Sequence, residues 1–391
     1  MTRSKPPSKP SSKPSSKQGR TKRQQTLPFD QPQAVDRIVL NRERFLEILS
    51  EFDALEENPA LKDRVAWLKA AIENGVSPDS PLAASGNGHG VAMHREVLIA
   101  ELGQILDAKT IERGKYYLRR LERGVRSYEP GKINDINLLR WKEYPEILTD
   151  SLWMLPKRDT SGAHLGWYWG NFIPQIPHQM MLRYTKKGDW VLDPFAGSGT
   201  TLIECRRLGR NGIGIELNGE VAAKATEVMQ LEPNPSSILT EIAVGDSRSV
   251  DAAALLTGYG IEKVQLLILH PPYADIIAFS DDPRDLSRAD GLEDYLKGFG
   301  DVVDNLTPLL ERGRYCALVI GDKYARGEWI PLGFRCMEAV LARGYSLKSV
   351  IVKNFDETRA KRDQKQLWRY RALVGGFYIF KHEYVMVFKK V

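Results

Sequence analysis

The sequence predicts an α/β fold, in which a mainly parallel sheet with helices on both faces follows a small helical domain and a disordered basic tail. From about residue 165, strand-like and helix-like segments alternate along the chain, which is typical of a parallel sheet with covering helices. Before that point apolar residues recur at helical spacing, and the start of the chain is built of Ser, Lys and Pro. These shifts predict a tail over 1–30, a helical domain over 31–130 and an α/β domain over 140–391.

The net positive charge of the basic tail is larger than that of the whole chain. The 391-residue chain has a formal net charge of +6. Residues 1–29 contain eight Lys and Arg residues and no acid, which leaves −2 for the rest of the chain. The folded part is therefore not a basic domain, and nucleic-acid binding would need local patches together with the tail's attraction to phosphates.

A short peptide, Gln24–Phe29, lies at the end of the tail. Its Gln24, Leu27 and Phe29 are spaced as in the peptides with which replication and repair proteins bind the sliding clamp, which it resembles. The alternative is a linker that leads into the first helix. The resemblance implies a sliding clamp as a possible partner.

The helical domain is expected in two stretches, 37–75 and 97–121, separated by a Ser-, Pro- and Gly-rich loop over 77–90. One side of the second stretch is basic, and its residues are Lys115, Arg119, Arg120, Arg123 and Arg126. Such a face is either a solvated surface or a contact with the substrate.

The α/β domain contains seven strand candidates, which are Trp190–Asp193, Gly212–Glu216, Ile242–Gly245, Leu266–Leu269, Tyr315–Ile320, Ser346–Lys353 and Tyr384–Lys389. The helices expected between them are Thr201–Leu208, Gly219–Met229, Leu292–Leu310 and Leu332–Arg343.

No apolar stretch approaches the roughly 20 residues of a membrane helix. The three cysteines, Cys205, Cys316 and Cys336, lack metal-ligand spacing, which predicts buried free thiols, no metal, and a soluble cytoplasmic protein.

Three acids and two glycines follow successive strands of this domain. Asp193 closes the first strand, Gly197 and Gly199 make a tight turn, and Thr200 starts a helix; Glu216 and Asp246 follow the next two strands. Glycines let a ligand approach the backbone, and a helix start presents free N–H groups. A dinucleotide site uses the same geometry, but its third glycine would fall at Leu202, which counts against NAD.

The run Asp193-Pro194-Phe195-Ala196-Gly197-Ser198-Gly199-Thr200 resembles the donor loop of S-adenosylmethionine-dependent methyltransferases. Upstream, residues 168–175, which begin with Tyr168, resemble the segment that contacts the methionine half of the donor in that family, and Asn171, Phe172, Ile173 and Pro174 are its candidate donor-binding residues. His270-Pro271-Pro272-Tyr273 resembles the catalytic loop of the DNA amino-methyltransferases that modify cytosine N4 or adenine N6. The resemblance covers residues 140–391 and implies a seven-stranded, Rossmann-like methyltransferase sheet whose last strand is antiparallel. It implies that Glu216 binds the ribose hydroxyls and Asp246 the adenine amine.

For the catalytic loop, the resemblance implies that the His270 side chain and the Pro271 carbonyl accept the two hydrogens of the base amine, and that Tyr273 stacks on the base. Pro271 and Pro272 suit this role because they make the loop rigid. His270 departs from the Asp, Asn or Ser usual at its position, and only a neutral imidazole can accept a hydrogen bond. The missing carboxylate favours cytosine N4 over adenine N6. The alternative is that His270 only caps the strand in an inactive relic.

The long connection between the last two strands is the candidate for DNA contact, because it mixes cations for phosphates with aromatic residues for unstacked bases. Its residues include Arg359, Lys361, Arg362, Lys365, Trp368, Arg369 and Arg371. The alternative is a basic surface hairpin.

The resemblance thus implies a nucleoid-associated DNA methyltransferase, as in restriction–modification, that acts on a flipped-out base. An RNA base methyltransferase and an inactive module that retains donor binding are the competing hypotheses. The oligomeric state is left open.

Overall fold

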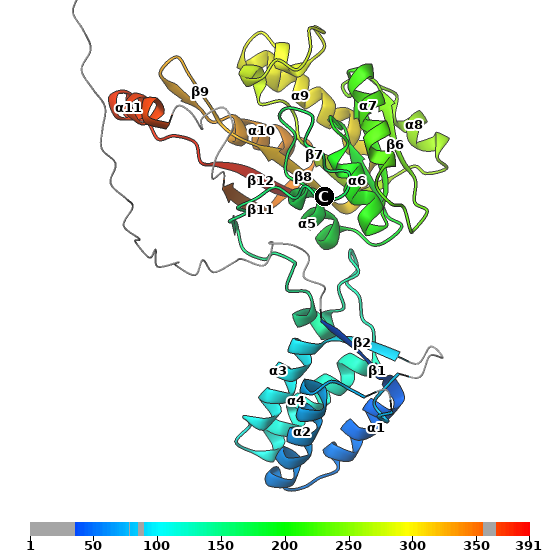
Figure 1. Cartoon of the computed structure of the whole chain (residues 1–391). Coiled ribbons are helices and arrows are strands. Elements are labelled where there is room, and N and C mark those ends of the chain that lie inside the picture. The colour runs from blue at the N-terminus through cyan, green and yellow to red at the C-terminus, as the bar shows by residue number, and fades with distance from the viewer. Residues whose placement is uncertain (1–35, 78, 85–89, 355–364) are drawn as a thin grey trace, which may run out of the picture. The chain divides into compact units, whose positions relative to one another are not determined.

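The computed structural model describes residues 36–77, 79–84, 90–354 and 365–391, with Lys365 described by its backbone alone (Figure 1). The predicted tail, including the peptide Gln24–Phe29, lies outside the described residues. So do three of the predicted DNA-contact residues, Arg359, Lys361 and Arg362.

The N-terminal part repeats the order strand, helix, helix twice. Its elements are β1 (Arg37–Asn41), α1 (Arg42–Asp53), α2 (Asn58–Glu73), β2 (Gly90–His94), α3 (Arg95–Leu106) and α4 (Ile111–Arg126). The two strands pair antiparallel, with Arg37 opposite His94 and Asn41 opposite Gly90. The expectation of helix from residue 37 is therefore wrong for the first five residues. Buried Ile38 and Leu40 alternate with an exposed Val39, which is a strand pattern.

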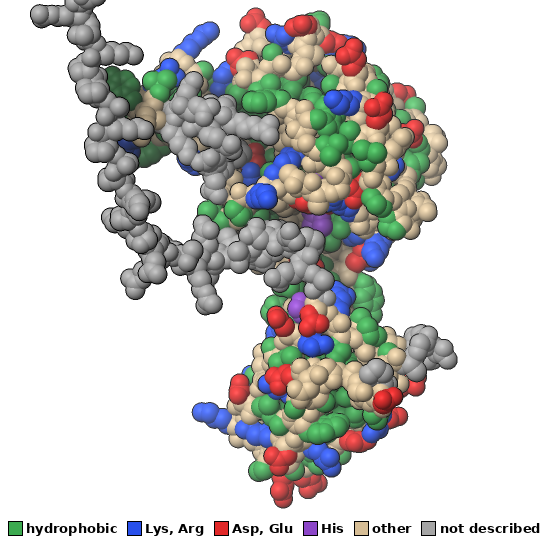
Figure 2. Space-filling view, viewed as in Figure 1, with side chains coloured by type: hydrophobic (Ala, Val, Ile, Leu, Met, Phe, Trp, Pro, Cys, Tyr) green, Lys and Arg blue, Asp and Glu red, His purple; other side chains and the backbone are tan. Residues whose placement is uncertain are grey.

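The surface of this N-terminal part is not a positive patch. Residues 36–126 contain 14 basic and 15 acidic residues, and Figure 2 shows the two kinds interspersed over this part. Three of the five predicted basic side chains of α4 are in ion pairs, Arg119 with Asp53, Arg120 with Glu101, and Arg126 with Glu122. This pairing favours the solvated surface over a contact with phosphates.

The α/β part begins after a connecting segment that includes the short helix η1 (Leu138–Glu143). Its strands are β3 (Leu152–Trp153), β4 (Trp190–Asp193), β5 (Asn211–Glu216), β6 (Thr240–Val244), β7 (Val264–Leu269), β8 (Leu310–Ile320), β9 (Lys323–Ala325), β10 (Glu328–Ile330), β11 (Tyr345–Asn354) and β12 (His382–Lys390). Its helices are α5 (Gln175–Tyr184), α6 (Thr200–Leu208), α7 (Gly219–Gln230), α8 (Ala252–Gly258), α9 (Leu292–Leu306), α10 (Leu332–Leu341) and α11 (Lys365–Gly375), with the short helices η2 (Ala274–Ile276), η3 (Leu286–Arg288) and η4 (Thr307–Leu309).

The large sheet has eight strands in the order β3-β11-β12-β8-β7-β4-β5-β6. All seven predicted strands are present, and β12 runs antiparallel to both of its neighbours, as expected. The predicted count of seven is corrected by β3. Its two residues pair parallel with Val352 and Lys353 at the sheet edge, and a two-residue strand is too short to show a period in the sequence.

Helices cover both faces of this sheet, with α5 and α6 on one face and α9 and α10 on the other (Figure 1). Strand β7 and the second half of β8, residues 316–320, are mainly buried and apolar, as expected for parallel strands covered on both faces. The three cysteines are buried and free, as predicted. Within the described residues, no helix combines the length and the apolar character needed to cross a membrane.

The direction in which successive strands are added to the sheet reverses at β4. From β4 the chain continues outward through β5 and β6, and then returns to place β7 on the other side of β4. The loops after β4 and β7 therefore leave the same edge of the sheet in opposite directions, and it is between two such loops that the ligand-binding crevice of α/β sheets lies. Both sequence motifs fall on these two loops.

Candidate active site

The loop after β4 forms a glycine turn at the start of α6. Gly197 and Gly199 have φ angles of +48° and +75°, which residues with a Cβ rarely adopt. Asp193 is fully buried, and its carboxylate accepts hydrogen bonds from the Phe195 N–H at 2.9 Å and from the Thr201 hydroxyl at 2.5 Å. Burial raises the pKa of Asp193 to about 6. These two hydrogen bonds to Asp193 thus fix the conformation of the loop.

Glu216, at the end of β5, connects this loop to the next one. Its two carboxylate oxygens accept the N–H of Gly197 and the N–H of Asn218, both at 2.9 Å. Burial raises the pKa of Glu216. Each carboxylate oxygen has a further lone pair, so the side chain can still accept hydrogen bonds from the hydroxyls of a bound ribose.

Asp246, which follows β6, is engaged by a cation that the sequence interpretation missed. Arg248 approaches both of its carboxylate oxygens, with the closest contact at 2.8 Å. Burial opposes the charge of Asp246, but the hydrogen bonds from Arg248 lower its pKa. Asp246 therefore stays ionised and keeps lone pairs for one additional donor.

The other predicted donor-loop residues complete the turn. The Pro194 carbonyl accepts a 2.7 Å hydrogen bond from the Ser247 hydroxyl, and Phe195 packs against the core of the sheet. Thr200 is the first residue of α6, and its hydroxyl lies 3.2 Å from that of Ser198. These contacts fix the glycine turn from both sides.

The upstream segment Asn171–Pro174 lies against this turn and ends at α5. The Asn171 side-chain amide donates to the Ser198 hydroxyl at 3.0 Å. Arg158 holds the segment from behind, because its guanidinium donates to the Asn171 side-chain oxygen at 3.1 Å and to the Phe172 carbonyl at 2.6 Å. Ile173 is half-buried and Pro174 is buried, directly before α5. The prediction that Asn171–Pro174 contributes to the donor site thus has a structural basis.

An aromatic pair covers the glycine turn, and of its two members the sequence interpretation assigned Tyr168 but not Phe279. The ring of Tyr168 stacks on that of Phe279, with centroids 5.8 Å apart and an interplanar angle of 21°. A Cβ added at Gly197 would lie 3.1 Å from the Tyr168 ring. Burial raises the pKa of the Tyr168 hydroxyl, and the charges of Glu216 and Asp285 add to this effect. The donor crevice is thus walled by carboxylates and aromatic rings together.

The loop after β7, His270–Tyr273, meets the donor segment directly. The centroids of the Phe172 ring and the His270 imidazole are 4.6 Å apart. The Tyr273 ring stands edge-on to the imidazole, with a centroid distance of 5.7 Å. Desolvation lowers the pKa of His270 to about 4. The imidazole is therefore neutral near pH 7, as accepting a hydrogen bond requires.

The backbone of this loop is held in an unusual conformation. Ala274 has a φ of +50°, which is uncommon for a residue with a side chain. The Tyr295 hydroxyl donates a 2.6 Å hydrogen bond to the Pro272 carbonyl. That bond commits the Pro272 carbonyl, whereas no described residue donates a hydrogen bond to the Pro271 carbonyl. This arrangement suits the predicted acceptor role of Pro271.

A buried ion pair lies behind Tyr273. Its hydroxyl donates to a carboxylate oxygen of Glu383 at 2.8 Å, and the other oxygen lies 3.0 Å from the Lys353 ammonium. Both charged side chains are 6% exposed. They occupy facing positions of β11 and β12, so the end of the antiparallel strand pair supports the catalytic loop. The pattern of apolar and polar residues along the two strands did not indicate that Lys353 and Glu383 are buried.

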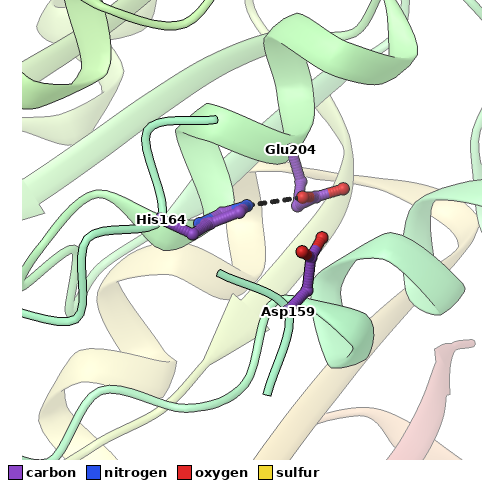
Figure 3. A group of neighbouring side chains, drawn as sticks. All are labelled: Asp159, His164 and Glu204. Atoms are coloured by element: carbon purple, nitrogen blue, oxygen red, sulfur yellow. Dashed lines mark hydrogen bonds and ion pairs between the residues drawn. The ribbon is translucent and has the colours of Figure 1, made fainter. Parts of the chain in front are cut away.

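A second buried network lies beneath the donor segment (Figure 3). Among the described residues, Asp159, His164 and Glu204 have potential metal ligands within 4.8 Å of one another. The Arg207 guanidinium lies 3.0 Å from Asp159 and 3.4 Å from Glu204. This cation already occupies the position between the carboxylates, so the cluster does not fit a metal ion.

Glu204 stays charged within this network. Burial opposes its ionisation, but hydrogen bonds from His164 and His178, each 2.7 Å long, lower its pKa to about 2. Glu204 belongs to α6, His178 to α5 and His164 to the loop before them. The carboxylate therefore fastens the donor segment and both helices together.

The described part of the predicted DNA-contact set belongs to a separate element. Lys365, Trp368, Arg369 and Arg371 are in α11, which Figure 1 shows apart from the sheet. The Arg371 guanidinium lies 5.3 Å from the Trp368 ring. The donor and catalytic residues are therefore brought together, whereas the described members of the DNA-contact set lie on a separate helix.

Comparison with known proteins gives a family for the donor part of the chain. Residues 139–227 match the family model described as DNA methylase. The type II methyltransferase M.MjaII of Methanocaldococcus jannaschii is 47% identical over 51 residues, or 13% of this chain and 10% of that protein. M.Cfr9I of Citrobacter freundii is 37% identical over 82 residues, 21% of this chain and 26% of that protein.

A third relative, M.SmaI of Serratia marcescens, is 36% identical over 97 residues, which cover 22% of this chain and 32% of that protein. The chain thus spans about a third or less of the length of these curated relatives. Among solved structures, TrmN from Thermus thermophilus is 17% identical over 57% of this chain and 50% of that chain, with a TM-score of 0.38. These similarities relate residues 139–227 to the DNA methylase family model, and the fold of the α/β part is a mixed sheet with helices on both faces.

Proposed function

We propose that this chain, which carries a segment of the DNA amino-methyltransferase family at residues 139–227, transfers a methyl group from S-adenosylmethionine to the exocyclic amine of a base in DNA. One observation carries the proposal. The donor segment and the catalytic loop meet at Phe172 and His270, whose rings are 4.6 Å apart. They meet at the strand switch between β4 and β7, where the two reactants of a transfer reaction can be held together.

The residues of the donor crevice fit an S-adenosyl group. The glycine turn lets a ligand approach the backbone closely, Glu216 has lone pairs for the ribose hydroxyls, and Asp246 can accept one more hydrogen bond, from an adenine amine. When bound, S-adenosylmethionine supplies an electrophilic methyl group on a sulfonium sulfur. The Asn171–Pro174 segment, fixed by Arg158, orients the end of the crevice that faces the catalytic loop.

The catalytic loop can prepare an amine for attack. The lone pair of a base amine is delocalised into its ring, and two acceptors on the amine hydrogens draw that lone pair out of the plane. We assign these acceptors to the neutral His270 imidazole and the Pro271 carbonyl, and the base-stacking surface to Tyr273. The rigidity of the two prolines and the hydrogen bond from Tyr295 to the Pro272 carbonyl keep the acceptors in place.

Cytosine N4 is the proposed target, with adenine N6 as the alternative. No carboxylate occupies the first position of the catalytic loop, where His270 stands. The base would be flipped out of its stack, because a paired base cannot reach the crevice. Modification of DNA in a restriction–modification setting follows from the type II relatives.

Transfer of a labelled methyl group tests the proposal. The full-length protein is incubated with methyl-labelled S-adenosylmethionine and either genomic DNA or total RNA, and the modified nucleoside is identified by mass spectrometry. We expect label on DNA as N4-methylcytosine, and none with His270→Ala. Label on RNA alone, or donor binding without transfer to any substrate, would contradict the proposal.

A further inference from the structure

The segment between β11 and β12 forms an arm together with the hairpin β9–β10. We define the arm as residues 323–330 and 366–381. The two pieces are joined by aromatic contacts, since Tyr324 stacks on Phe377 and Trp329 packs on Phe380, each with centroids 4.2 Å apart. Through these contacts, the hairpin supports the segment that follows α11.

The arm carries an unusual helix. A surface helix normally turns its apolar face toward the core, whereas α11 exposes apolar side chains at successive turns. Tyr370, Leu373 and Val374 are 64%, 69% and 71% exposed, and Leu367 is 43% exposed. Figure 2 shows hydrophobic side chains at the surface where Figure 1 places α11. Contiguous exposed apolar groups of this kind mark a binding surface.

Cations flank this apolar face. Arg369 and Arg371 belong to the same helix, Lys381 follows it, and Arg326 lies at the tip of the hairpin. The described residues of the arm contain five Lys and Arg residues and one acidic residue, Glu328. Positive charge around an apolar patch is complementary to a polyanion with an apolar interior, which describes duplex DNA. The same charges disfavour pairing with a second copy of the arm.

The arm is attached to the catalytic loop. The chain enters the segment from Lys353 and leaves it at Glu383, the pair that holds the Tyr273 hydroxyl. On the hairpin side, Lys323 forms an ion pair with Asp275, two residues after Tyr273. One root of the arm therefore contacts Tyr273, on which the target base would stack, and the other contacts Asp275, two residues after the end of the catalytic loop.

From these four observations, and resting on the proposed function, we propose that the arm inserts the apolar face of α11 into the base stack of duplex DNA beside the target base. Leu373 and Val374 would fill the space that the flipped base leaves, while Arg369 and Arg371 bind the neighbouring phosphates. Apolar side chains inserted between base steps stabilise an opened duplex in this way. The arm is then the element that makes a paired base available to Tyr273.

The test compares duplex DNA with the same DNA made single-stranded. Sheared genomic DNA is used before and after heat denaturation, with full-length wild type, the double variant Leu373→Ser/Val374→Ser, and Leu231→Ser as a control at a similarly exposed leucine. We expect the double variant to lose about 10-fold or more of its transfer to duplex DNA and to keep its transfer to denatured DNA within about 2-fold. The control should match wild type on both.

Permanganate oxidation of unpaired thymines in the duplex gives a readout that does not need transfer. Wild type is expected to raise this reactivity, and the double variant is not. Equal losses on both DNA forms, or unchanged duplex opening, would overturn the proposal. So would a double variant that retains duplex transfer but changes from dimer to monomer in sedimentation, because the face would then bind a second copy. If wild type labels neither DNA form, the proposed function fails, while the permanganate result still decides whether the arm opens DNA.

Discussion

The hydroxyl of Tyr273 donates a 2.8 Å hydrogen bond to Glu383, a residue 110 positions later in the chain. Glu383 is in turn paired with Lys353 on the neighbouring strand. The orientation of the Tyr273 ring, on which we propose the target base stacks, thus depends on two charged residues that never contact the base themselves.

Removing only the hydroxyl tests this dependence. Tyr273→Phe keeps an aromatic surface but loses a hydrogen bond to a charged group, which is worth about 1.5–3 kcal/mol. We expect transfer to DNA to fall about 10- to 100-fold, with donor affinity unchanged. Steady-state kinetics and calorimetric donor titration measure the two effects. A variant with wild-type kinetics would show that the base does not need an oriented ring.

The contribution of the Lys353–Glu383 pair to stability can be tested by removing one of its charges and then both. Lys353→Met leaves the Glu383 carboxylate buried without its cation, and breaking such a pair costs about 3–5 kcal/mol of unfolding free energy. The double variant Lys353→Met/Glu383→Leu should recover most of this loss, because no charge is left unpaired. Urea unfolding of wild type, Lys353→Met, Glu383→Leu and the double variant completes the cycle. If the double variant is no more stable than Lys353→Met, the pairing does not explain the loss.

The protonation of His270 sets the acid limit of activity. Its pKa in the folded protein is lowered to about 4, so the imidazole remains neutral, and able to accept a hydrogen bond, at all pH values above that. Transfer should be constant from about pH 7.5 to about pH 5.5 and decline only toward about pH 4. The His270→Ser variant should lack this decline in the range where circular dichroism shows an intact fold. A midpoint near the ordinary value of a histidine, or the same acid limb in the variant, would refute this role.

Arg158 is expected to act on donor binding. Arg158→Met removes the hydrogen bonds to the Asn171 side chain and the Phe172 carbonyl, which should weaken S-adenosylmethionine binding by about 10-fold. Isothermal titration calorimetry provides the measurement, and Arg312→Met, at an exposed arginine, controls for the loss of charge. Unchanged affinity in Arg158→Met would separate the Asn171 segment from the donor site.

The cluster in Figure 3 should be insensitive to metal removal, because Arg207 lies between its carboxylates. We expect a chelator to leave the melting temperature of wild type unchanged. Arg207→Met should lower the unfolding free energy by about 3 kcal/mol, since buried Glu204 loses a cation. A fall in the wild-type melting temperature on chelation, restored by zinc, would mean that the cluster holds a metal after all.

The donor loop, the acids at the strand ends and the catalytic tetrapeptide could be predicted from the sequence because each lies within a few residues of a strand end. Strand ends of a parallel sheet share one edge, so local patterns imply a common site. The function of Asp193 was not predictable in the same way. Its position was right, but its carboxylate points into the loop and clamps it.

The supporting residues could not be predicted, because their partners are distant in the chain. Arg158 acts through residues 13 and 14 positions away, whereas Lys353 is linked to the catalytic loop through Glu383. A charged residue within a strand usually marks the solvent face, so the pattern of the two strands did not predict that Lys353 and Glu383 are buried. The arm shows the same limit, since the contacts that join α11 and its following residues to the hairpin β9–β10 are made between residues far apart in the chain.

The repeated strand–helix–helix order of residues 36–126 has its own consequence for the chain. A two-stranded ribbon such as β1–β2 is barely stable alone, and each strand belongs to a different repeat. The N-terminal part is therefore a covalently linked pseudo-dimer, in which each half completes the other. Truncation after the first repeat would remove the partner strand, so this part should melt in a single transition and tolerate deletion only as a whole.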